Sequence, residues 1–208
     1  MTRIALFGGS FNPPHVAHAL VAHYVLATQP VDEVWIVPVY AHAFGKELAP
    51  YEDRVAMCRL AVAELGPRAP GDRASSRVKV SRAEEDLASK PGFTVSRTLD
   101  LVTHLQERSP TSEFRLVIGA DILGETHKWY RWNEVVAKAP LIAIGRSGFD
   151  APPGTTVTGV TMPEISATAI RELVAKGKSI DAPQLAALLP REVLRYIASH
   201  GLYRAPTP

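Results

Sequence analysis

The stretch that decides the fold is Gly8-Gly9-Ser10-Phe11-Asn12-Pro13-Pro14-His15-Val16-Ala17-His18. It follows the apolar run Arg3–Phe7 and precedes apolar residues at helical spacing from His15 to Leu26. Glycine at the end of a strand lets the backbone approach a ligand where a side chain would block it. Proline at the start of a helix loses no needed hydrogen bond. The pattern therefore predicts a strand, a ligand-binding turn and a helix.

Two histidines stand at the start of that predicted helix. His15 and His18 are three residues apart, so both imidazoles should lie on one face, beside the free N–H groups of the first turn. The positive end of the helix dipole makes such a place an anion site. Surface histidines with no role are the common alternative, and no third ligand stands nearby, so we predict no metal site. The turn also lacks Gly-x-Gly-x-x-Gly and Gly-Lys-Ser/Thr, which disfavours a hydride-transfer enzyme and a P-loop hydrolase.

Composition limits the class of protein. The 208 residues are 46% hydrophobic and 21% charged, which is ordinary globular usage. A formal net charge of +2 gives no reason to expect a nucleic-acid partner. The single cysteine, Cys58, excludes an internal disulfide, and no apolar run approaches the roughly 18 residues of a membrane span. We expect a soluble cytoplasmic protein that binds no membrane.

Apolar runs alternate with segments of helical period along most of the chain. The predicted strands are Arg3–Phe7, Val34–Val39, Val78–Val80, Phe114–Ile118, Leu141–Ile144 and Thr155–Val160. The predicted helices are His15–Leu26, Tyr51–Leu65, Thr94–Glu107, Ser166–Lys176 and Arg191–His200, and Gly66–Ser76 is expected to be a mobile loop. This alternation favours an α/β fold with a mostly parallel sheet and helices on both faces. We predict one domain over 1–208, with an α/β core at 1–160 and a small helical C-terminal subdomain at 161–208.

A second motif is Ile165-Ser166-Ala167-Thr168-Ala169-Ile170-Arg171. Ser166 is an N-cap candidate, Thr168 lies in the first helical turn, and Arg171 follows one turn later. Hydroxyls and a guanidinium at a helix N-terminus suit a phosphate group. On its own, the motif could equally be a capped amphipathic helix with a surface arginine.

Together, the two motifs resemble those of the nucleotidyltransferase superfamily. Its members carry Gly-Gly-Thr/Ser-Phe-Asp-Pro-x-His-x-Gly-His and Ile-Ser-Ser-Thr-x-Ile-Arg, and the turn at residues 8–11 with both histidines matches the first. Three positions depart from these patterns, namely Asn12 for aspartate, Ala17 for glycine and Ala167 for serine. The resemblance implies a Rossmann-like nucleotidyltransferase fold.

Intermediate features narrow the resemblance to nicotinate mononucleotide adenylyltransferases. Gly119-Ala120-Asp121 followed by Trp129 resembles that family's Gly-x-Asp…Trp element, in which the tryptophan stacks on the pyridine ring. Gly92-Phe93-Thr94-Val95 resembles its stretch beside the pyridine, and Arg146 follows a strand near the adenine. Lys46 takes the place of its phosphate-binding lysine in a divergent loop. Each feature also has a plainer explanation: Trp129 could pack against Trp132, Asp121 could cap a helix, and Lys46 could be a solvated loop lysine.

The resemblance implies transfer of the adenylyl group of ATP to nicotinate (or nicotinamide) mononucleotide, with Mg²⁺ carried on ATP. The implied catalytic residues are His15, His18, Lys46 and Arg171. The implied ATP-binding residues are Gly8, Gly9, Ser10, Phe11, His15, His18, Gly119, Asp121, Arg146, Ser166, Thr168 and Arg171. The implied mononucleotide-binding residues are Lys46, Thr94 and Trp129.

Two alternatives stay open from the sequence. One is phosphopantetheine adenylyltransferase or another small-molecule adenylyltransferase, and the other is a catalytically silent nucleotide-binding module of the same fold. A class I aminoacyl-tRNA synthetase is disfavoured because 208 residues leave no room for an anticodon domain. The sequence leaves open the choice between acid and amide substrate, and also the oligomeric state.

Overall fold

The computed structural model describes the chain except for residues 43–44, 46, 64–76, 146–149, 178–181 and 205–208. Six parallel strands form one sheet in the order β3-β2-β1-β4-β5-β6. They are β1 (Thr2–Gly9), β2 (Glu33–Pro38), β3 (Val78–Val80), β4 (Ser112–Gly119), β5 (Leu141–Ile144) and β6 (Thr156–Val157). The strand order reverses between β1 and β4, and ligands of such sheets bind in the crevice beyond the carboxyl ends of these strands.

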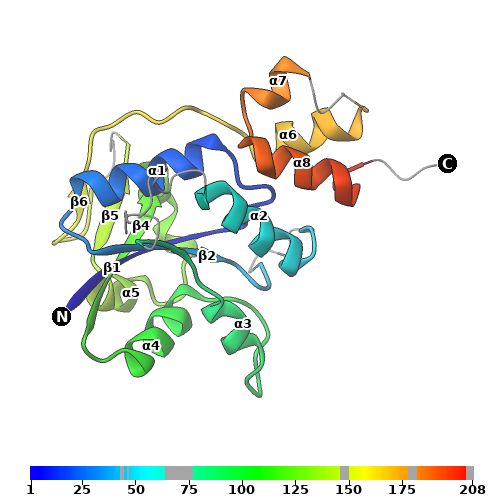
Figure 1. Cartoon of the computed structure of the whole chain (residues 1–208). Coiled ribbons are helices and arrows are strands. Elements are labelled where there is room, and N and C mark those ends of the chain that lie inside the picture. Colours follow the sequence, from blue (N-terminus) through cyan, green and yellow to red (C-terminus); the bar gives the residue numbers. More distant parts are fainter. Residues whose placement is uncertain (43–44, 46, 64–76, 146–149, 178–181, 205–208) are drawn as a thin grey trace, which may run out of the picture.

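Helices cover both faces of the sheet (Figure 1). One face carries α1 (Val16–Thr28) and α2 (Tyr51–Ala63), and the other carries α3 (Ala83–Ala88), α4 (Thr98–Arg108) and α5 (Trp132–Lys138). A 3₁₀ helix, η2 (Ala120–Lys128), follows β4 directly. The three C-terminal helices lie together beside α2. They are α6 (Ala167–Ala175), α7 (Pro183–Ala186) and α8 (Arg191–His200).

Alternation along the central strand β1 supplies a core on each face. Ile4 and Leu6 join the apolar cluster under α4 and α5, whereas Ala5 joins the cluster under α1. A strand that is buried on both faces reads as a continuous apolar run, as this one does. A third cluster packs Met57 of α2 against Ile170 and other apolar residues of the C-terminal helices.

The predicted fold class is confirmed, and the described residues contain no helix that is long and apolar enough to cross a membrane. The helix predicted from Thr94 starts at Thr98, so Thr94 lies in the preceding loop. The strand predicted over Thr155–Val160 is only Thr156–Val157. The short helices α3, α5 and α7 were not predicted, because four to seven residues are too few to display a helical period. The loop predicted at Gly66–Ser76 lies entirely outside the described residues.

Candidate active site

The glycines predicted to approach a ligand stand where β1 and β4 end side by side. Gly9 closes β1, and a Cβ atom there would come within 3.1 Å of the Phe11 ring. Gly119 closes β4, and a Cβ atom there would collide with the carboxylate of Asp121. A side chain at either position would therefore displace the side chain that stands two residues later, Phe11 or Asp121. A Cβ on Gly8 would meet nothing within 4 Å, so its surroundings leave room for a ligand.

His15 and His18 form a stacked pair at the start of α1. Their ring centroids lie 3.7 Å apart with an interplanar angle of 27°. Phe11 packs edge-on against His18, with centroids 4.9 Å apart. Phe11 adopts a φ of 46°, a left-handed conformation that a bulky residue rarely occupies and that often accompanies a functional turn. The two imidazoles are thus held by packing before any ligand binds.

Both histidines are neutral in this environment. Burial lowers the pKa of His15 to about 4, and burial together with the adjacent His15 lowers that of His18 to about 3. The backbone N–H of His15 donates to Nδ1 of His18 at 3.1 Å. Because Nδ1 accepts, the neutral ring carries its proton on Nε2 and can donate it to a ligand. Nδ1 of His15 is buried with no hydrogen-bond partner among the described residues.

The start of α1 differs from the expectation in two respects. His15 is the N-cap residue, with extended φ and ψ, rather than a member of the first turn. The N–H of Val16, expected to be free, donates to the carbonyl of Leu188 at 3.0 Å. The segment after α7 thus occupies one of the donors predicted for an anion, so side chains must contribute more to anion binding than the sequence suggested.

The second motif forms the capped helix start that the sequence predicts. Oγ of Ser166, the N-cap of α6, accepts from the N–H of Ala169 at 3.3 Å. Arg171 donates from Nη2 to Oγ1 of Thr168 at 3.1 Å and from Nη1 to the carbonyl of Asn12 at 2.8 Å. Arg171 and Asn12 are 159 positions apart in the sequence, so the fold brings the two motifs into direct contact.

Two residues that organise the site were not predicted to do so. Arg54 is 1% exposed and donates to the carbonyls of Ser10, Val39 and Ala49 at 2.8–3.0 Å. Asn12, noted only as a departure from the superfamily pattern, is 4% exposed and takes part in four hydrogen bonds. The sequence did carry a signal for Arg54. Met57 and Cys58, which are buried residues of α2, follow it by three and four positions, so Arg54 lies on the same helix face.

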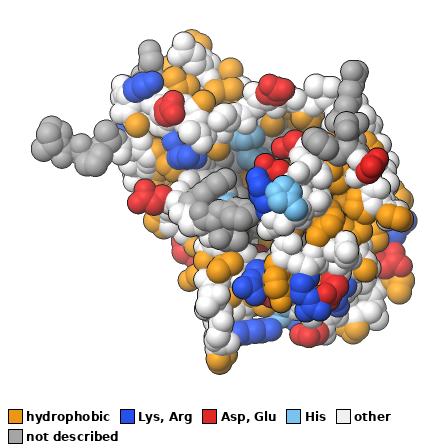
Figure 2. All heavy atoms as spheres, turned by 180° about the vertical axis from the view of Figure 1, so that it is seen from behind, with side chains coloured by type: hydrophobic (Ala, Val, Ile, Leu, Met, Phe, Trp, Pro, Cys, Tyr) orange, Lys and Arg blue, Asp and Glu red, His pale blue; other side chains and the backbone are white. Residues whose placement is uncertain are grey.

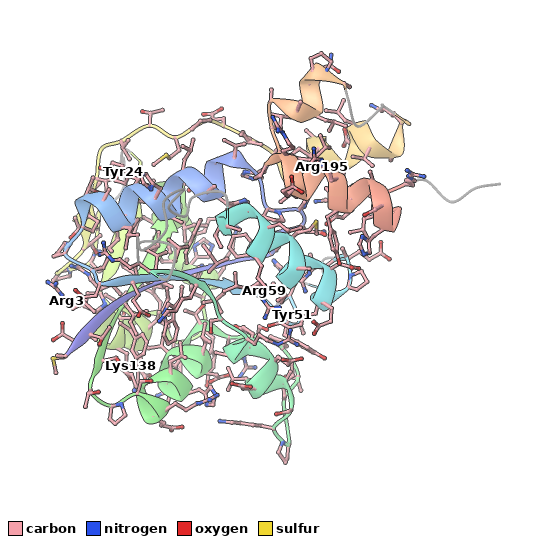
Figure 3. The ribbon with its side chains drawn as sticks, in the orientation of Figure 1. Arg3, Tyr24, Tyr51, Arg59, Lys138 and Arg195 are labelled. Carbon is pink, nitrogen blue, oxygen red and sulfur yellow. The ribbon has the colours of Figure 1, made fainter. Side chains whose placement is uncertain are left out.

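The predicted pyridine-side residues lie on the other face of the sheet. Trp129 is half-buried, packs against the cluster under α4 and α5, and meets Trp132 edge-on with ring centroids 5.3 Å apart. Phe93 packs against the same cluster, and its neighbour Thr94 is exposed. Tyr40 follows β2 and contacts both Phe93 and Tyr51 through its ring. Tyr51 stands at the start of α2, toward α3 (Figure 3).

Lys46 and Arg146 lie outside the described residues, so their predicted roles remain predictions. Figure 2 shows histidine side chains beside Lys or Arg side chains where the C-terminal helices meet the rest of the molecule. Histidine donors and cationic side chains at one place suit a polyanionic ligand.

The low pKa values of His15 and His18 predict a stability that depends on pH. In the unfolded chain both imidazoles titrate near 6.5, so unfolding takes up protons once the pH falls below that value. Their contribution is therefore complete above about pH 6.5 and is lost progressively as the pH falls toward the folded pKa values of about 4 and about 3. Urea unfolding of the ligand-free protein should show a free energy of unfolding that falls more steeply over this window than in the His15→Gln/His18→Gln variant. Parallel pH profiles for the two proteins would contradict the burial of neutral imidazoles.

The comparisons with known proteins agree with this site. The model of the family described as "Cytidylyltransferase-like" matches residues 6–173, which include both motifs. A solved structure described as "Plasmodium falciparum nicotinic acid mononucleotide adenylyltransferase complexed with NaAD" has a TM-score of 0.77, with 19% identity and 98% of each chain covered. Fold and site together define a nucleotidyltransferase of the cytidylyltransferase-like class.

Curated relatives are closer in sequence. The "Probable nicotinate-nucleotide adenylyltransferase" of Anaeromyxobacter dehalogenans (strain 2CP-1) is 47% identical, covering 97% of this chain and 96% of the relative. The "Nicotinate-nucleotide adenylyltransferase" of Bacillus subtilis (strain 168) is 30% identical, covering 99% of this chain and all of the relative. The chain belongs to the nicotinate-nucleotide adenylyltransferase family.

Proposed function

We propose that this enzyme transfers the adenylyl group of ATP to nicotinate mononucleotide, or to its amide, and releases pyrophosphate in the synthesis of NAD. The contact between the two motifs, through Arg171 and Asn12, is the observation that carries the proposal. It brings a guanidinium to the turn that holds the paired histidines, and such a set of donors suits a triphosphate. The names of the relatives supply the pyridine substrate.

The reaction needs positioning and charge neutralisation more than a base. The attacking group is the 5′-phosphate of the mononucleotide, which is largely dianionic at neutral pH because its second pKa is about 6. One of its oxygens forms a bond to the α-phosphorus of ATP, and the bond from that phosphorus to the bridging oxygen breaks. Pyrophosphate leaves with the electron pair, and the products are deamido-NAD (or NAD) and pyrophosphate. Phosphoryl transfers of this kind depend mainly on bringing the reactants together in line.

We assign roles from the geometry. His18 donates its Nε2 proton to the α-phosphate, where negative charge develops, and His15 donates to a neighbouring phosphate oxygen. Arg171 and the predicted Lys46 hold phosphates, with Arg171 on those that leave. The glycines that end β1 allow the nucleotide to approach the backbone. We also assign ATP contacts to Asp121, which is exposed at the start of η2, and to Thr168, which accepts a hydrogen bond from Arg171.

We propose that a divalent cation enters this site as part of the ATP complex. The described residues contain no group of three histidine, cysteine, aspartate or glutamate side chains that could hold a metal ion. The histidine and arginine side chains assigned to the phosphates are hydrogen-bond donors, which suit phosphate oxygens. We propose Mg²⁺, which keeps several waters and binds through substrate phosphates, and which lowers the negative charge of the leaving pyrophosphate.

The chemistry proposed here uses no covalent intermediate. Cys58 is buried, and burial raises the pKa of its thiol, so a reactive thiolate does not form there. The neutral His18 keeps Nδ1 engaged with the backbone of His15 and presents a protonated Nε2, which is a donor rather than a nucleophile.

Rates of pyrophosphate release with ATP and a panel of acceptors test the proposed reaction. Nicotinate mononucleotide, nicotinamide mononucleotide and phosphopantetheine are the informative acceptors, and chromatography identifies the product. We expect a dinucleotide from a pyridine mononucleotide and no transfer to phosphopantetheine. Faster transfer to phosphopantetheine would select the rival enzyme, and ATP binding without any transfer would select the silent module.

Stacking of Trp129 on the pyridine ring predicts a selective kinetic defect. Trp129→Ala should raise KM for the mononucleotide about 5–150-fold, the equivalent of about 1–3 kcal/mol for stacking on a base. KM for ATP should barely change, and Trp129→Phe should restore most of the binding because a π-face survives. Trp132→Ala is the matched control, since it removes the neighbouring ring of the same edge-on pair.

A purely structural Trp129 gives a different result. Because it packs against the core cluster, truncation would then lower the melting temperature strongly and impair both substrates alike. Measuring the melting temperature and both KM values on one preparation distinguishes the two roles.

We also propose that residues 1–208 act as one domain in the cytoplasm, where both substrates are available. The C-terminal part at 161–208 supports the core directly: Leu188 accepts from Val16, and Arg171 donates to Asn12. An isolated core would lose both contacts at the phosphate-binding turn.

A further inference from the structure

We propose that Tyr203 is a positioning residue for adenylyl transfer, acting through Asn12 on the guanidinium of Arg171 and on the backbone that precedes α2. This inference rests on the proposed function of the site. Tyr203 lies three residues beyond the end of α8 and was not singled out by either sequence motif. Its hydroxyl nevertheless donates to Oδ1 of Asn12 at 2.9 Å, across 191 positions of sequence.

Asn12 is the centre of the contacts. Its Oδ1 accepts a second hydrogen bond from the N–H of Ala49 at 3.0 Å, and its Nδ2 donates to the carbonyl of Glu47 at 3.4 Å. Its own carbonyl accepts from Arg171 at 2.8 Å. One buried residue therefore contacts three segments: its side chain bonds the segment at 47–49 and Tyr203, and its main-chain carbonyl bonds Arg171 of the second motif. Because the side chain fixes where the Asn12 backbone lies, loss of a side-chain bond would shift the carbonyl that accepts from Arg171.

The amide of Asn12 suits this place. Many members of the superfamily carry aspartate here, and a carboxylate could accept from Tyr203 and Ala49 but could not donate to Glu47. The amide satisfies both needs at once, with its oxygen accepting two bonds and its nitrogen donating one. Tyr203 supplies one of the two bonds that hold the amide oxygen, so the hydroxyl determines how firmly the side chain is oriented.

The turn that ends α8 brings Tyr203 to Asn12. Gly201 ends α8 with a φ of 62°, and the N–H of Leu202 donates back to the carbonyl of Ile197 at 3.1 Å, the 6→1 bond of a Schellman motif. Tyr203 itself has a φ of 62°, which is costly for an aromatic residue and persists only where other contacts hold it. Burial raises the pKa of Tyr203, so its hydroxyl keeps the proton that it donates to Asn12.

Arg54 holds the same region independently. It donates to the carbonyl of Ser10, two residues before Asn12, and to the carbonyl of Ala49, whose N–H donates to Asn12. Loss of the Tyr203 hydroxyl should therefore leave the segment folded and change only the precision with which Asn12 and Arg171 are placed. Such a change affects catalysis without unfolding the site.

Tyr203→Phe is the direct test, and Tyr196→Phe is the matched control. Tyr196 also belongs to the C-terminal segment, and its hydroxyl donates to Asp53 at 2.8 Å, so each variant removes one hydroxyl bond from the same part of the protein. We expect Tyr203→Phe to lower kcat/KM for ATP about 3- to 10-fold, the scale of one hydrogen bond. The melting temperatures of the two variants should be alike, KM for the mononucleotide should stay unchanged, and Tyr196→Phe should retain the wild-type rate.

A double-mutant cycle with Asn12→Ala shows whether Tyr203 acts through Asn12. We expect the double variant to be no slower than Asn12→Ala alone, because the hydroxyl then has nothing to orient. Equal rates for Tyr203→Phe and wild type, or additive losses in the double variant, would overturn the inference. A wild-type protein that forms no dinucleotide would instead overturn the proposed function, so the two failures are distinguishable.

Discussion

Replacing His18 by alanine is expected to lower the rate of adenylyl transfer by about 10²–10³-fold, the loss measured when one transition-state donor is removed elsewhere. His18 holds its Nε2 proton ready because Nδ1 is engaged by the N–H of His15. The proton therefore meets the α-phosphate without prior rearrangement of the ring. The loss should fall mainly on kcat, because the charge on the α-phosphate oxygens grows only in the transition state.

His23→Ala is the matched control for His18→Ala. His23 is an exposed residue of the same helix, and its replacement should leave the rate unchanged. Single-turnover rates and melting temperatures of both variants make the comparison. Turnover of His18→Ala near that of the wild type would remove the proposed role of the histidine pair.

Loss of the Arg171 guanidinium is expected to have an effect of similar size. Arg171→Ala should lower kcat/KM for ATP by about 10²–10³-fold, because it removes both a cation and a directed donor from the leaving phosphates. Arg171→Lys should recover only part of this loss, since an ammonium group is a point charge without the planar fork that binds phosphate in two places. A lysine at this position also lacks the Nη1 atom that donates to the carbonyl of Asn12.

Arg195→Lys provides the control for a change of arginine to lysine in the C-terminal helices. Arg195 lies on α8 and pairs with Glu192 at 2.5 Å on an exposed surface (Figure 3). Its replacement should affect neither the melting temperature nor the rate by a measurable amount. Wild-type KM for ATP in Arg171→Lys would mean that Arg171 serves only to join the second motif to Asn12.

The parts of the structure that could be predicted are those with a local cause. A run such as Leu141–Ile144 has the composition of a buried parallel strand, and the structure has that strand with the same bounds. The cap at Ser166 likewise depends only on the few residues that follow it. The fold class could therefore be predicted from the alternation of such runs with helical segments, and both motifs from residue types at fixed spacing.

The parts that could not be predicted depend on contacts between distant segments. Nothing near Asn12 in the sequence indicates that Tyr203 and Arg171 will meet it. The N–H of Val16 was expected to bind an anion, but the chain returns after α7 and places the Leu188 carbonyl there. Such contacts follow from how the C-terminal helices pack on α2, which no local pattern encodes.

The stereochemical outcome at the α-phosphorus tests the central claim most directly. ATP that carries a sulfur atom of known configuration on the α-phosphate reacts with nicotinate mononucleotide, and the configuration of the dinucleotide product is determined. A single in-line attack by the mononucleotide phosphate, with His18 acting only as a donor, predicts inversion. Retention would mean two successive displacements through an adenylylated residue of the protein, and it would contradict the roles assigned here to His15, His18 and Arg171.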